Sequence, residues 1–496
     1  MKSLWRWGSV VALIALAAYF IVAVWRFGAF PFDDTFITLR YARNLALHGA
    51  LTFNIGDSSH VDGYSSPAWT LVLAFIIRVG FDGAQAAVWL SKACGVAAGL
   101  GAFVVARVLG ARRGWALLAP LACFTSVSWL VWSTPGMETP FVACCNLALL
   151  YALSRGAPAD GPRLTAMLVC AIARPESAVL VGTALGLEVL SSRTLEPTAR
   201  RRVLLRLGWL VAALGALFVA HWLYYGYALP NTFYVKLAGV TSWQRGRADL
   251  VTFISSHGIW LALVAAFGLL FVAGAPRKIA VLTLIAFAAT AYAYGRAGGD
   301  YIDYHRYYQP AVPSLFALLA VAASRLSERS KPLTIGVAIA GLGVAAALVV
   351  DGEQHLRTAW RSQTLSAAAF YARAWRTAGE ALARAYPATT VIAVRPAGLI
   401  PYVTDFPTLD VLGLNDHDIA LHAEILRAYD PGHNKEASPR QIVARHPDVI
   451  VNHPTFSATD QSGHPHPQTP AVISNAYTWK CIPAGHSGWL CVFEKR

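Results

Sequence analysis

Two adjacent acids, Asp33 and Asp34, follow an apolar segment near the start of the chain. That segment, residues 8–25, is long enough to cross a lipid bilayer, so the two carboxyl groups are expected at a membrane surface. Charged groups are costly there and need a purpose. A carboxylate in that position can act as a general base on an acceptor hydroxyl group. The alternative is structural, because Asp34 precedes a helical pattern over residues 35–47 and suits a helix N-cap.

Two later segments beside apolar runs combine cations with aromatic side chains. They are residues 229–236 (LPNTFYVK) and residues 298–308 (GGDYIDYHRYY). Arginine and lysine bind phosphate well, and tyrosine can contact a sugar or a lipid headgroup. The alternative is a belt of aromatic residues at the membrane interface, with the cations extended toward water. The candidate ligands for a phosphate or a sugar are Lys236, Asp300, Tyr304, His305 and Arg306.

Further polar residues are expected to shape a cavity around this chemistry. Arg174 and Glu176 interrupt the apolar run 164–190 at a proline, and they should form an ion pair or line a polar cavity. Glu138 lies at an expected helix N-terminus, where the helix dipole alone would favour an acid. Residues 61–67 can also be an ordinary turn marked by glycine and proline.

No residue pattern indicates a metal or a nucleotide cofactor. The histidines in residues 432–436 and 463–466 fit no common zinc spacing, and solvated loop histidines are the simpler interpretation. The chain has no P-loop, no GxGxxG before a helix, and no HExxH or GxSxG motif. Of seven cysteines, five lie in apolar runs, where we expect them to be inert. Cys481 and Cys491 lie in a polar region and could form a disulfide if that region is extracytoplasmic.

The composition indicates an integral membrane protein. Of 496 residues, 56% are apolar and 14% are charged, whereas a soluble protein carries roughly a quarter charged residues. The net charge of +14 is compatible with nucleic-acid binding, but the arginines and lysines cluster in short loops between apolar runs, as in membrane proteins. The expected partner is therefore the lipid bilayer, and no nucleic acid.

Apolar runs of spanning length recur through residues 1–350 and predict about 11 transmembrane helices. Residues 67–80 are too short to span and are expected to form an amphipathic helix at the interface. The basic loops then all fall on one side, which places the N-terminus in the cytoplasm and favours an uncleaved first span over a signal peptide. The expected spans are residues 8–25, 85–108, 115–133, 139–154, the two halves of 164–190, 203–224, 258–274, 278–294, 310–324 and 333–350.

The outer side receives most of the remaining polar residues. A first outer loop covers residues 26–84, and a polar tail covers residues 351–496. We therefore predict a polytopic α-helical membrane domain over residues 1–350 and a small extracytoplasmic α/β domain over residues 351–496. The predicted elements of the tail are strands at 390–394 and 449–451 and helices at 360–385 and 418–429.

An ordered set of motifs extends over most of the chain. The segments are DDTFITLRYARNLALHGALTFN (33–54), DGYSSPAWTLVLA (62–74), PGMETPFVA (135–143), ARPESAVL (173–180), LPNTFYVKL (229–237), GGDYIDYHRYYQPAVP (298–313), DVLGLNDHDIA (410–420) and PGHNK (431–435). Together they resemble the GT-C superfamily of glycosyltransferases, and more narrowly the bacterial terminal β-arabinofuranosyltransferases of cell-wall arabinan. The ordered set is far more specific than any one segment.

This resemblance implies a glycosyltransferase of the bacterial inner membrane, with its site on the outer face of the helical bundle. The catalytic carboxylate would be Asp33 or Asp34, of which Asp33 is preferred. Lys236 and Arg306, assisted by His305, would hold the phosphate of a polyprenyl-phosphate sugar, so that no nucleotide or other cofactor is needed. The residues that the resemblance implies around the cavity are Arg43, Asp62, Tyr64, Glu138, Arg174, Glu176 and Asn231. The sugar would be D-arabinofuranose, and the acceptor a cell-surface glycan or a protein.

Two departures from the family concern the acceptor. Arg395 stands where relatives more often have an acid, and the tail is shorter than in the cell-wall enzymes, so the acceptor need not be arabinan. Two other functions stay open at this point. A transporter or flippase for a lipid-linked glycan would need polar residues at mid-membrane depth in several helices. A non-catalytic scaffold that displays the tail would need no phosphate-binding pocket near Asp33.

Overall fold

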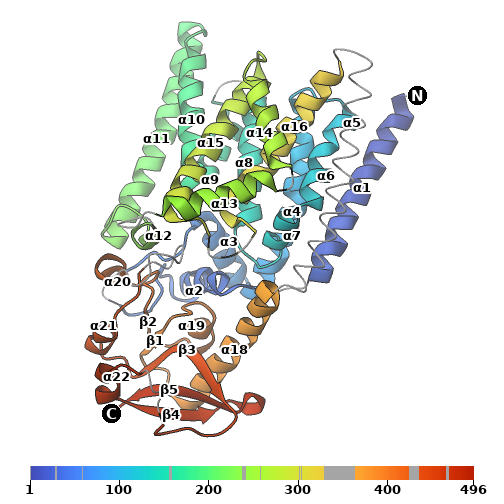
Figure 1. The fold of residues 1–496 in the computed structure, drawn as a ribbon. Helices are drawn as coiled ribbons and strands as arrows, with labels where there is room; N and C mark the ends of the chain where they lie inside the picture. Colours follow the sequence, from blue (N-terminus) through green and yellow to red (C-terminus); the bar gives the residue numbers. More distant parts are fainter. Residues whose placement is uncertain are drawn as a thin grey trace.

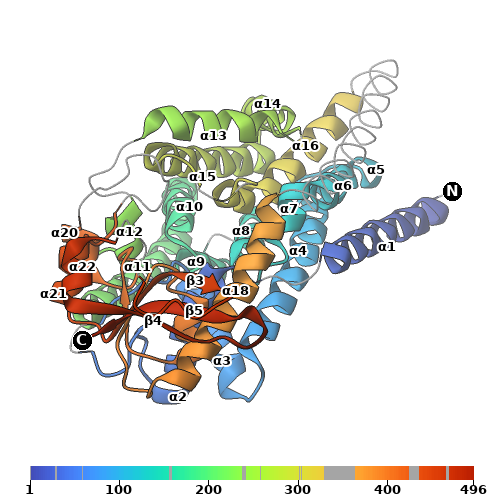
Figure 2. The ribbon, with the colours of Figure 1, turned by 60° about the horizontal axis from the view of Figure 1, so that its bottom comes forward.

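The computed structural model describes residues 2–27, 31–57, 60–155, 159–236, 242–256, 258–300, 302, 304–328, 363–423, 435–464 and 469–496. These residues form a helical bundle and a C-terminal unit with a five-stranded sheet, which lies across one end of the bundle (Figure 1, Figure 2). The predicted span 333–350, the predicted domain boundary at residue 350 and most of segment 431–435 lie outside the described residues.

The helices of the bundle coincide with most of the predicted apolar runs. They are α1 (Lys2–Phe27), α4 (Gly83–Val108), α5 (Arg113–Ala116), α6 (Leu118–Thr125), α7 (Val127–Trp132), α8 (Thr139–Ser154), α9 (Gly161–Ala171), α10 (Pro175–Ser192), α11 (Pro197–Tyr225), α13 (Trp243–Ser255), α14 (Ile259–Leu269), α15 (Ala275–Ala297), the 3₁₀ helix η1 (Arg306–Ala311) and α16 (Val312–Ser327). Three shorter helices lie at the end next to the C-terminal unit (Figure 1): α2 (Asp33–His48), α3 (Pro67–Arg78) and α12 (Asn231–Lys236).

Five helices in the described part of the chain are long and apolar enough to cross a membrane. They are α1, α4, α11, α15 and η1 continued by α16, and α13 with α14 would make a sixth across a bend of 84°. The predicted count of about 11 spans is therefore not confirmed. The predicted span 115–133 is divided into α5, α6 and α7. One cause is Ser126, whose extended backbone ends α6 and whose hydroxyl accepts a hydrogen bond from the Trp129 amide to cap α7.

Two predictions about local structure agree with the model. The run 164–190 is interrupted where predicted, and Pro175 is the first residue of α10, a position where a missing N–H costs nothing. Residues 67–78 form α3, a helix of 12 residues, which is too short to span a bilayer. It packs against α2, so α2 and α3 form one layer.

The end of the bundle away from the C-terminal unit carries a buried ion cluster. Glu188 near the end of α10 is fully buried and pairs with Arg163 of α9 at 2.8 Å and with Lys278 of α15 at 2.7 Å. The N-terminus and the α10–α11 connection lie at this same end (Figure 1). Three helices are therefore joined there by charge, in addition to the apolar core between them.

The C-terminal unit is a small α/β structure, as predicted. Its sheet has the order β2-β1-β3-β5-β4, with β1 parallel to β2 and β3, and with β5 antiparallel to β3 and β4. The elements are α18 (Gln363–Ala385), β1 (Ile392–Val394), α19 (Leu399–Thr404), β2 (Thr408–Asp410), α20 (His417–His422), α21 (Pro439–Ala444), β3 (Val449–Ser457), α22 (Ala471–Ala476), β4 (Tyr477–Pro483), the 3₁₀ helix η2 (Gly485–Ser487) and β5 (Trp489–Lys495).

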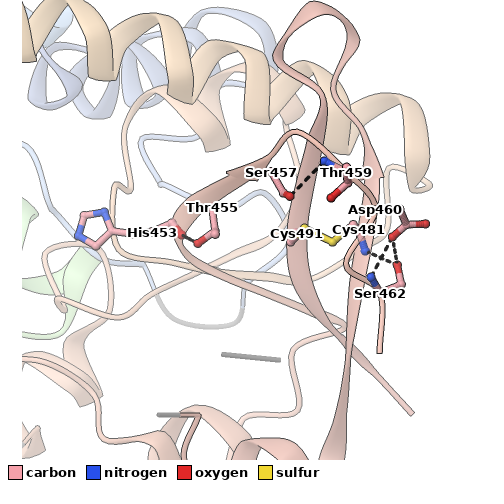
Figure 3. Close-up of a disulfide and its surroundings, with 8 residues drawn as sticks. All are labelled: His453, Thr455, Ser457, Thr459, Asp460, Ser462, Cys481 and Cys491. Atoms are coloured by element: carbon pink, nitrogen blue, oxygen red, sulfur yellow. Dashed lines mark hydrogen bonds between the residues drawn. A yellow bond between two sulfur atoms is a disulfide. The ribbon is translucent and has the colours of Figure 1, made fainter. Parts of the chain in front are cut away.

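A disulfide joins β5 and the edge strand β4. Cys481 of β4 lies directly opposite Cys491 of β5, and their sulfur atoms are bonded (Figure 3). The backbone amide of Cys481 donates a hydrogen bond to the hydroxyl of Ser462 at 2.9 Å, so the loop after β3 is held against the same strand pair. The other five cysteines are free and lie in the bundle.

The C-terminal unit shares a hydrophobic core with α2, α11 and α12. Tyr41 of α2, Tyr225 of α11 and Val235 of α12 pack in one buried cluster with Ile400 of α19 and Val449 of β3. Residues on both sides of this contact are almost completely inaccessible to water, with Tyr41 and Val449 both 0% exposed. The unit is therefore packed onto the bundle rather than joined to it by polar contacts alone.

Candidate active site

A small cavity of about 40 Å³ lies where the bundle meets the C-terminal unit. Its walls come from α2, the turn at residues 63–65, α12, η1 and the loop after β2. Most of its lining side chains are polar or charged, in contrast to the apolar core of the helical bundle. The polar and aromatic lining residues are Asp34, Thr38, Tyr64, Ser65, Glu138, Arg174, Thr232, Lys236, Arg306 and Tyr307.

Arg306 is the central cation of this cavity. A turn positions it, in which Tyr304 and His305 both adopt left-handed backbone conformations, with φ of 73° and 54°. Its side chain is 2% exposed and forms two hydrogen bonds to Asp300, at 3.1 and 3.2 Å. Burial raises the pKa of Asp300, and the neighbouring Arg306 opposes that rise. Asp300 thus fixes the guanidinium group through Nε and Nη2, which leaves Nη1 for a second partner.

Asp34 is that second partner. Its carboxylate oxygen Oδ2 accepts a hydrogen bond from Nη1 of Arg306 at 2.8 Å. The Asp34 side chain is 21% exposed and lines the cavity, so a bound molecule could contact it directly. The acid and the cation come from α2 and η1, and are 272 positions apart in the sequence.

Asp33 faces a different partner. Its two carboxylate oxygens accept hydrogen bonds from the backbone amides of Gly398, at 2.9 Å, and of Leu399, at 2.7 Å, at the start of α19. Burial raises its pKa to about 7. Asp33 is not among the residues that line the cavity. The N-cap alternative for the acid pair is wrong, because Phe32 holds the N-cap position of α2 and both acids lie in the first turn.

Lys236 is the second cation within reach of the cavity. It ends α12, and its Nζ atom lies 3.4 Å from the hydroxyl of Tyr307 and 5.8 Å from the centre of that ring. In the described part of the chain, no ion pair joins Lys236 to a carboxylate. Its charge is therefore available to an anion that enters the cavity.

Arg174 is the third cation, and two acids hold it. It pairs with Glu138 at 3.0 Å and with Glu176 at 3.1 Å, and it donates a hydrogen bond to the hydroxyl of Tyr294 at 3.0 Å. Glu138 also accepts a hydrogen bond from the hydroxyl of Ser65 at 3.1 Å. The predicted pairing of Arg174 with Glu176 is thus present, and Glu138 joins it.

The structure adds a tyrosine that the sequence reasoning did not single out. Tyr307 stacks on Tyr294 with ring centres 3.7 Å apart, and its hydroxyl accepts a hydrogen bond from Arg306 at 2.9 Å. Arg174 lies 5.6 Å from the centre of its ring, so Tyr307 is next to all three cations. The sequence alone does not distinguish Tyr307 from the tyrosines of an aromatic belt at a membrane interface. The three neighbouring cations do so in the structure.

Other predicted residues support the walls of the cavity. Asp62 accepts hydrogen bonds from His221 at 2.7 Å and from the backbone amide of Asn231 at 2.8 Å. Tyr64 lines the cavity and is hydrogen-bonded to the hydroxyl of Tyr225 at 3.0 Å. These contacts hold the turn at residues 63–65 against the start of α12.

Three predicted residues contact groups that do not line the cavity. Arg43 binds the carbonyl of Tyr402 at 2.9 Å and the carboxylate of Asp405 at 2.5 Å. The imidazole of His305 pairs with Asp249 of α13 at 2.8 Å. Tyr304 contributes its backbone carbonyl, which accepts a hydrogen bond from the indole of Trp132 at 2.9 Å. Nothing in the described part of the chain groups three or more metal-binding side chains.

Comparison with protein families matches the C-terminal unit alone. Residues 360–493 match the model of a domain of unknown function, DUF8728. No curated protein matches the sequence.

Solved structures match the whole chain. ArnT from Cupriavidus metallidurans, in a crystal structure bound to undecaprenyl phosphate, superposes with a TM-score of 0.56 at 16% identity, with 98% of each chain covered. The apo structure of the same protein gives a TM-score of 0.55 at 15% identity over the same shares of both chains. The chain therefore has the fold of ArnT, with a multi-pass helical bundle and a C-terminal unit.

Proposed function

We propose that this protein is a GT-C glycosyltransferase that transfers a sugar from a polyprenyl phosphate to a glycan or protein outside the cytoplasm. The observation that carries this proposal is the pairing of Asp34 with Arg306 in a cavity that Lys236 also lines. One acid and two cations within one cavity are the groups that glycosyl transfer from a lipid phosphate needs. The fold supports this proposal, because ArnT, which has a similar fold, is seen bound to undecaprenyl phosphate in one crystal structure.

In the proposed reaction, Asp34 takes the proton from an acceptor hydroxyl group. The acceptor oxygen attacks the anomeric carbon of the sugar, and the bond between that carbon and the phosphate oxygen breaks. The bonding electrons leave with the polyprenyl phosphate, which carries its negative charge next to Lys236 and Arg306. Cations placed where charge develops lower the barrier, and a positioned base contributes about 10²–10⁴-fold in rate.

Asp34 is the better candidate for the base than Asp33. Asp34 lines the cavity, whereas both oxygens of Asp33 are engaged by the amides of Gly398 and Leu399. The finer assignments follow from the resemblance in sequence. We propose D-arabinofuranose as the sugar, the bacterial inner membrane as the location and a cytoplasmic N-terminus. The cytoplasmic N-terminus is supported by the basic α10–α11 connection, which lies with the N-terminus at the end of the bundle away from the C-terminal unit (Figure 1).

A transporter is the less favoured function. It would need a polar path from the cavity to the other end of the bundle. Among the described residues, the helices between these two ends pack in one apolar cluster that includes Leu147 of α8, Val181 of α10 and Phe316 of α16. At the far end, Arg163 and Lys278 are joined to the buried Glu188.

The proposal can be tested with a deletion strain complemented by variants. Mass spectrometry of surface glycans and envelope proteins should show one sugar missing in the deletion strain and restored by the wild-type gene. The Asp34→Asn variant should fail to restore it at equal protein level in the membrane. A matched control is Asp418→Asn, because the side chain of Asp418 is 60% exposed on the C-terminal unit. Full restoration by Asp34→Asn would contradict the proposed role of Asp34.

A further inference from the structure

The C-terminal unit touches the cavity from two sides. Its α19 lies against α2, which carries Asp34, and its α20 lies against α12, which carries Lys236 (Figure 1). In addition, Leu414 of the loop after β2 lines the cavity itself. The unit is therefore in a position to set the geometry of both charged walls.

The first contact fixes the start of α2. Asp33 is hydrogen-bonded through both oxygens to the amides of Gly398 and Leu399. The approach is so close that a Cβ atom on Gly398 would lie 2.0 Å from the carbonyl oxygen of Asp33, so only glycine fits. Two turns further along α2, the buried Arg40 donates hydrogen bonds to the carbonyls of Pro401, at 2.7 Å, and Phe406, at 2.8 Å.

These contacts determine where Asp34 points. Successive side chains of an α-helix are separated by about 100° around its axis. Asp33 and Arg40 both bind the C-terminal unit, so the rotation of α2 about its axis is fixed by that unit. Asp34, the next residue after Asp33, is then directed toward Arg306 and the cavity. Rotation of α2 would separate Asp34 from Arg306.

The second contact fixes the start of α12. The side chain of Asn231 is fully buried and donates hydrogen bonds to the carbonyls of Gly413, at 2.7 Å, and Leu414, at 2.9 Å. Its amide oxygen is hydrogen-bonded to the imidazole of His417 at 2.8 Å. Lys236 follows at the other end of this six-residue helix. The same segment of the C-terminal unit therefore anchors the helix that carries the cation.

We propose that residues 398–417 of the C-terminal unit are an integral part of the active site, in which Asp33 and Asn231 are positioning residues. Asp33 sets the direction of Asp34, and Asn231 sets the place of Lys236. This inference rests on the proposed function for its catalytic consequence. Its structural half, that α19 fixes α2 and that the loop after β2 fixes α12, can be measured without any substrate.

The experiment compares Gly398→Ala, Asp33→Ala and Asn231→Ala in the full-length protein. Asp33→Ala removes the same contact as Gly398→Ala without a clash, so it keeps the test valid if the glycine variant does not fold. Gly114→Ala is the matched control, because an added Cβ there meets nothing within 4 Å. Binding of undecaprenyl phosphate is measured by native mass spectrometry, and sugar transfer by complementation of the deletion strain.

The expected results separate binding from transfer. Gly398→Ala and Asp33→Ala should bind undecaprenyl phosphate like the wild type, because Lys236 and Arg306 are unchanged, and should lose transfer by about 10²-fold, as displaced catalytic groups do. Asn231→Ala should weaken binding by roughly tenfold, because Lys236 loses its fixed position. Wild-type transfer in Asp33→Ala and wild-type binding in Asn231→Ala would overturn the inference.

Hydrogen exchange distinguishes a failure of this inference from a failure of the proposed function. In Gly398→Ala the amides of α2 should exchange faster, while those of α4 and α16 keep their protection. Unchanged exchange in α2 would refute the structural half, whatever reaction the protein catalyses. Faster exchange in α2 combined with a deletion strain that lacks no sugar would instead refute the glycosyltransferase and leave the contact established.

Discussion

The contact between Asp33 and α19 predicts a stability difference that depends on pH. Burial raises the pKa of Asp33 from 3.8 to about 7 in the folded protein. Between these two values the folded chain binds more protons than the unfolded chain, so the contribution of Asp33 to the free energy of unfolding falls as pH rises. The shift corresponds to at most about 4 kcal/mol, at 1.36 kcal/mol for each pH unit.

The Asp33→Asn variant removes this titration and isolates its effect. An asparagine amide has one acceptor oxygen, so one of the two backbone amides of Gly398 and Leu399 would face an NH₂ group instead. We expect this to cost about 1–3 kcal/mol at pH 5, where the wild-type carboxyl group is protonated. At pH 8 the wild type carries a buried charge that the variant lacks, so the variant's deficit should shrink or reverse.

Thermal unfolding in detergent, followed by tryptophan fluorescence, measures this difference from pH 5 to pH 8. Asp410 also titrates in this range, because burial raises its pKa to about 6, and its charge acts on Asp33, so it contributes to the same pH-dependent difference. Asp418→Asn is the control, since that side chain is exposed. A difference in Tm between wild type and Asp33→Asn that stays constant from pH 5 to pH 8 would refute the reasoning.

Three further predictions concern other parts of the molecule. Arg306→Lys should reduce sugar transfer at least about tenfold in the complementation assay, because an ammonium group cannot bridge two carboxylates as the guanidinium fork does; wild-type transfer would exclude that role. Non-reducing peptide mapping should recover Cys481 linked to Cys491, and replacing both with alanine should lower the free energy of unfolding of the C-terminal unit by about 3 kcal/mol. Glu188→Gln should destabilise the bundle by about 3–5 kcal/mol, because the buried Arg163 and the partly buried Lys278 lose their ion-pair partner, yet leave transfer per folded molecule unchanged; a loss of transfer without a loss of stability would contradict this.

The sequence predicted the parts of the fold that depend on local pattern. The apolar runs anticipated most helices, and Pro175 marked the division between α9 and α10. The strands at 390–394 and 449–451 correspond to β1 and the start of β3, because short runs of β-branched residues favour buried strands. The division of 115–133 at Ser126 was missed, since hydropathy does not show that a hydroxyl group caps a new helix in an apolar run.

The candidate site could be predicted only as a set of residues. The types and order of Asp34, Lys236 and Arg306 marked them as candidates, but nothing in the sequence shows that η1 meets α2. The sequence also could not decide between two adjacent acids, because their roles follow from the direction each takes on the helix. Leu414 was missed as a cavity residue for a similar reason, since an apolar side chain in a loop carries no chemical signature of its own.

The place of residues 398–417 in the chain has a consequence for biogenesis. The ribosome makes α1 to α16 first, and these helices can enter the membrane while the C-terminal unit is still being synthesised. Until that unit folds, the bundle lacks Leu414 at its cavity and the two amides that bind Asp33. A nascent or truncated chain therefore lacks one wall of the cavity and the contacts that hold Asp33 until the C-terminal unit has folded.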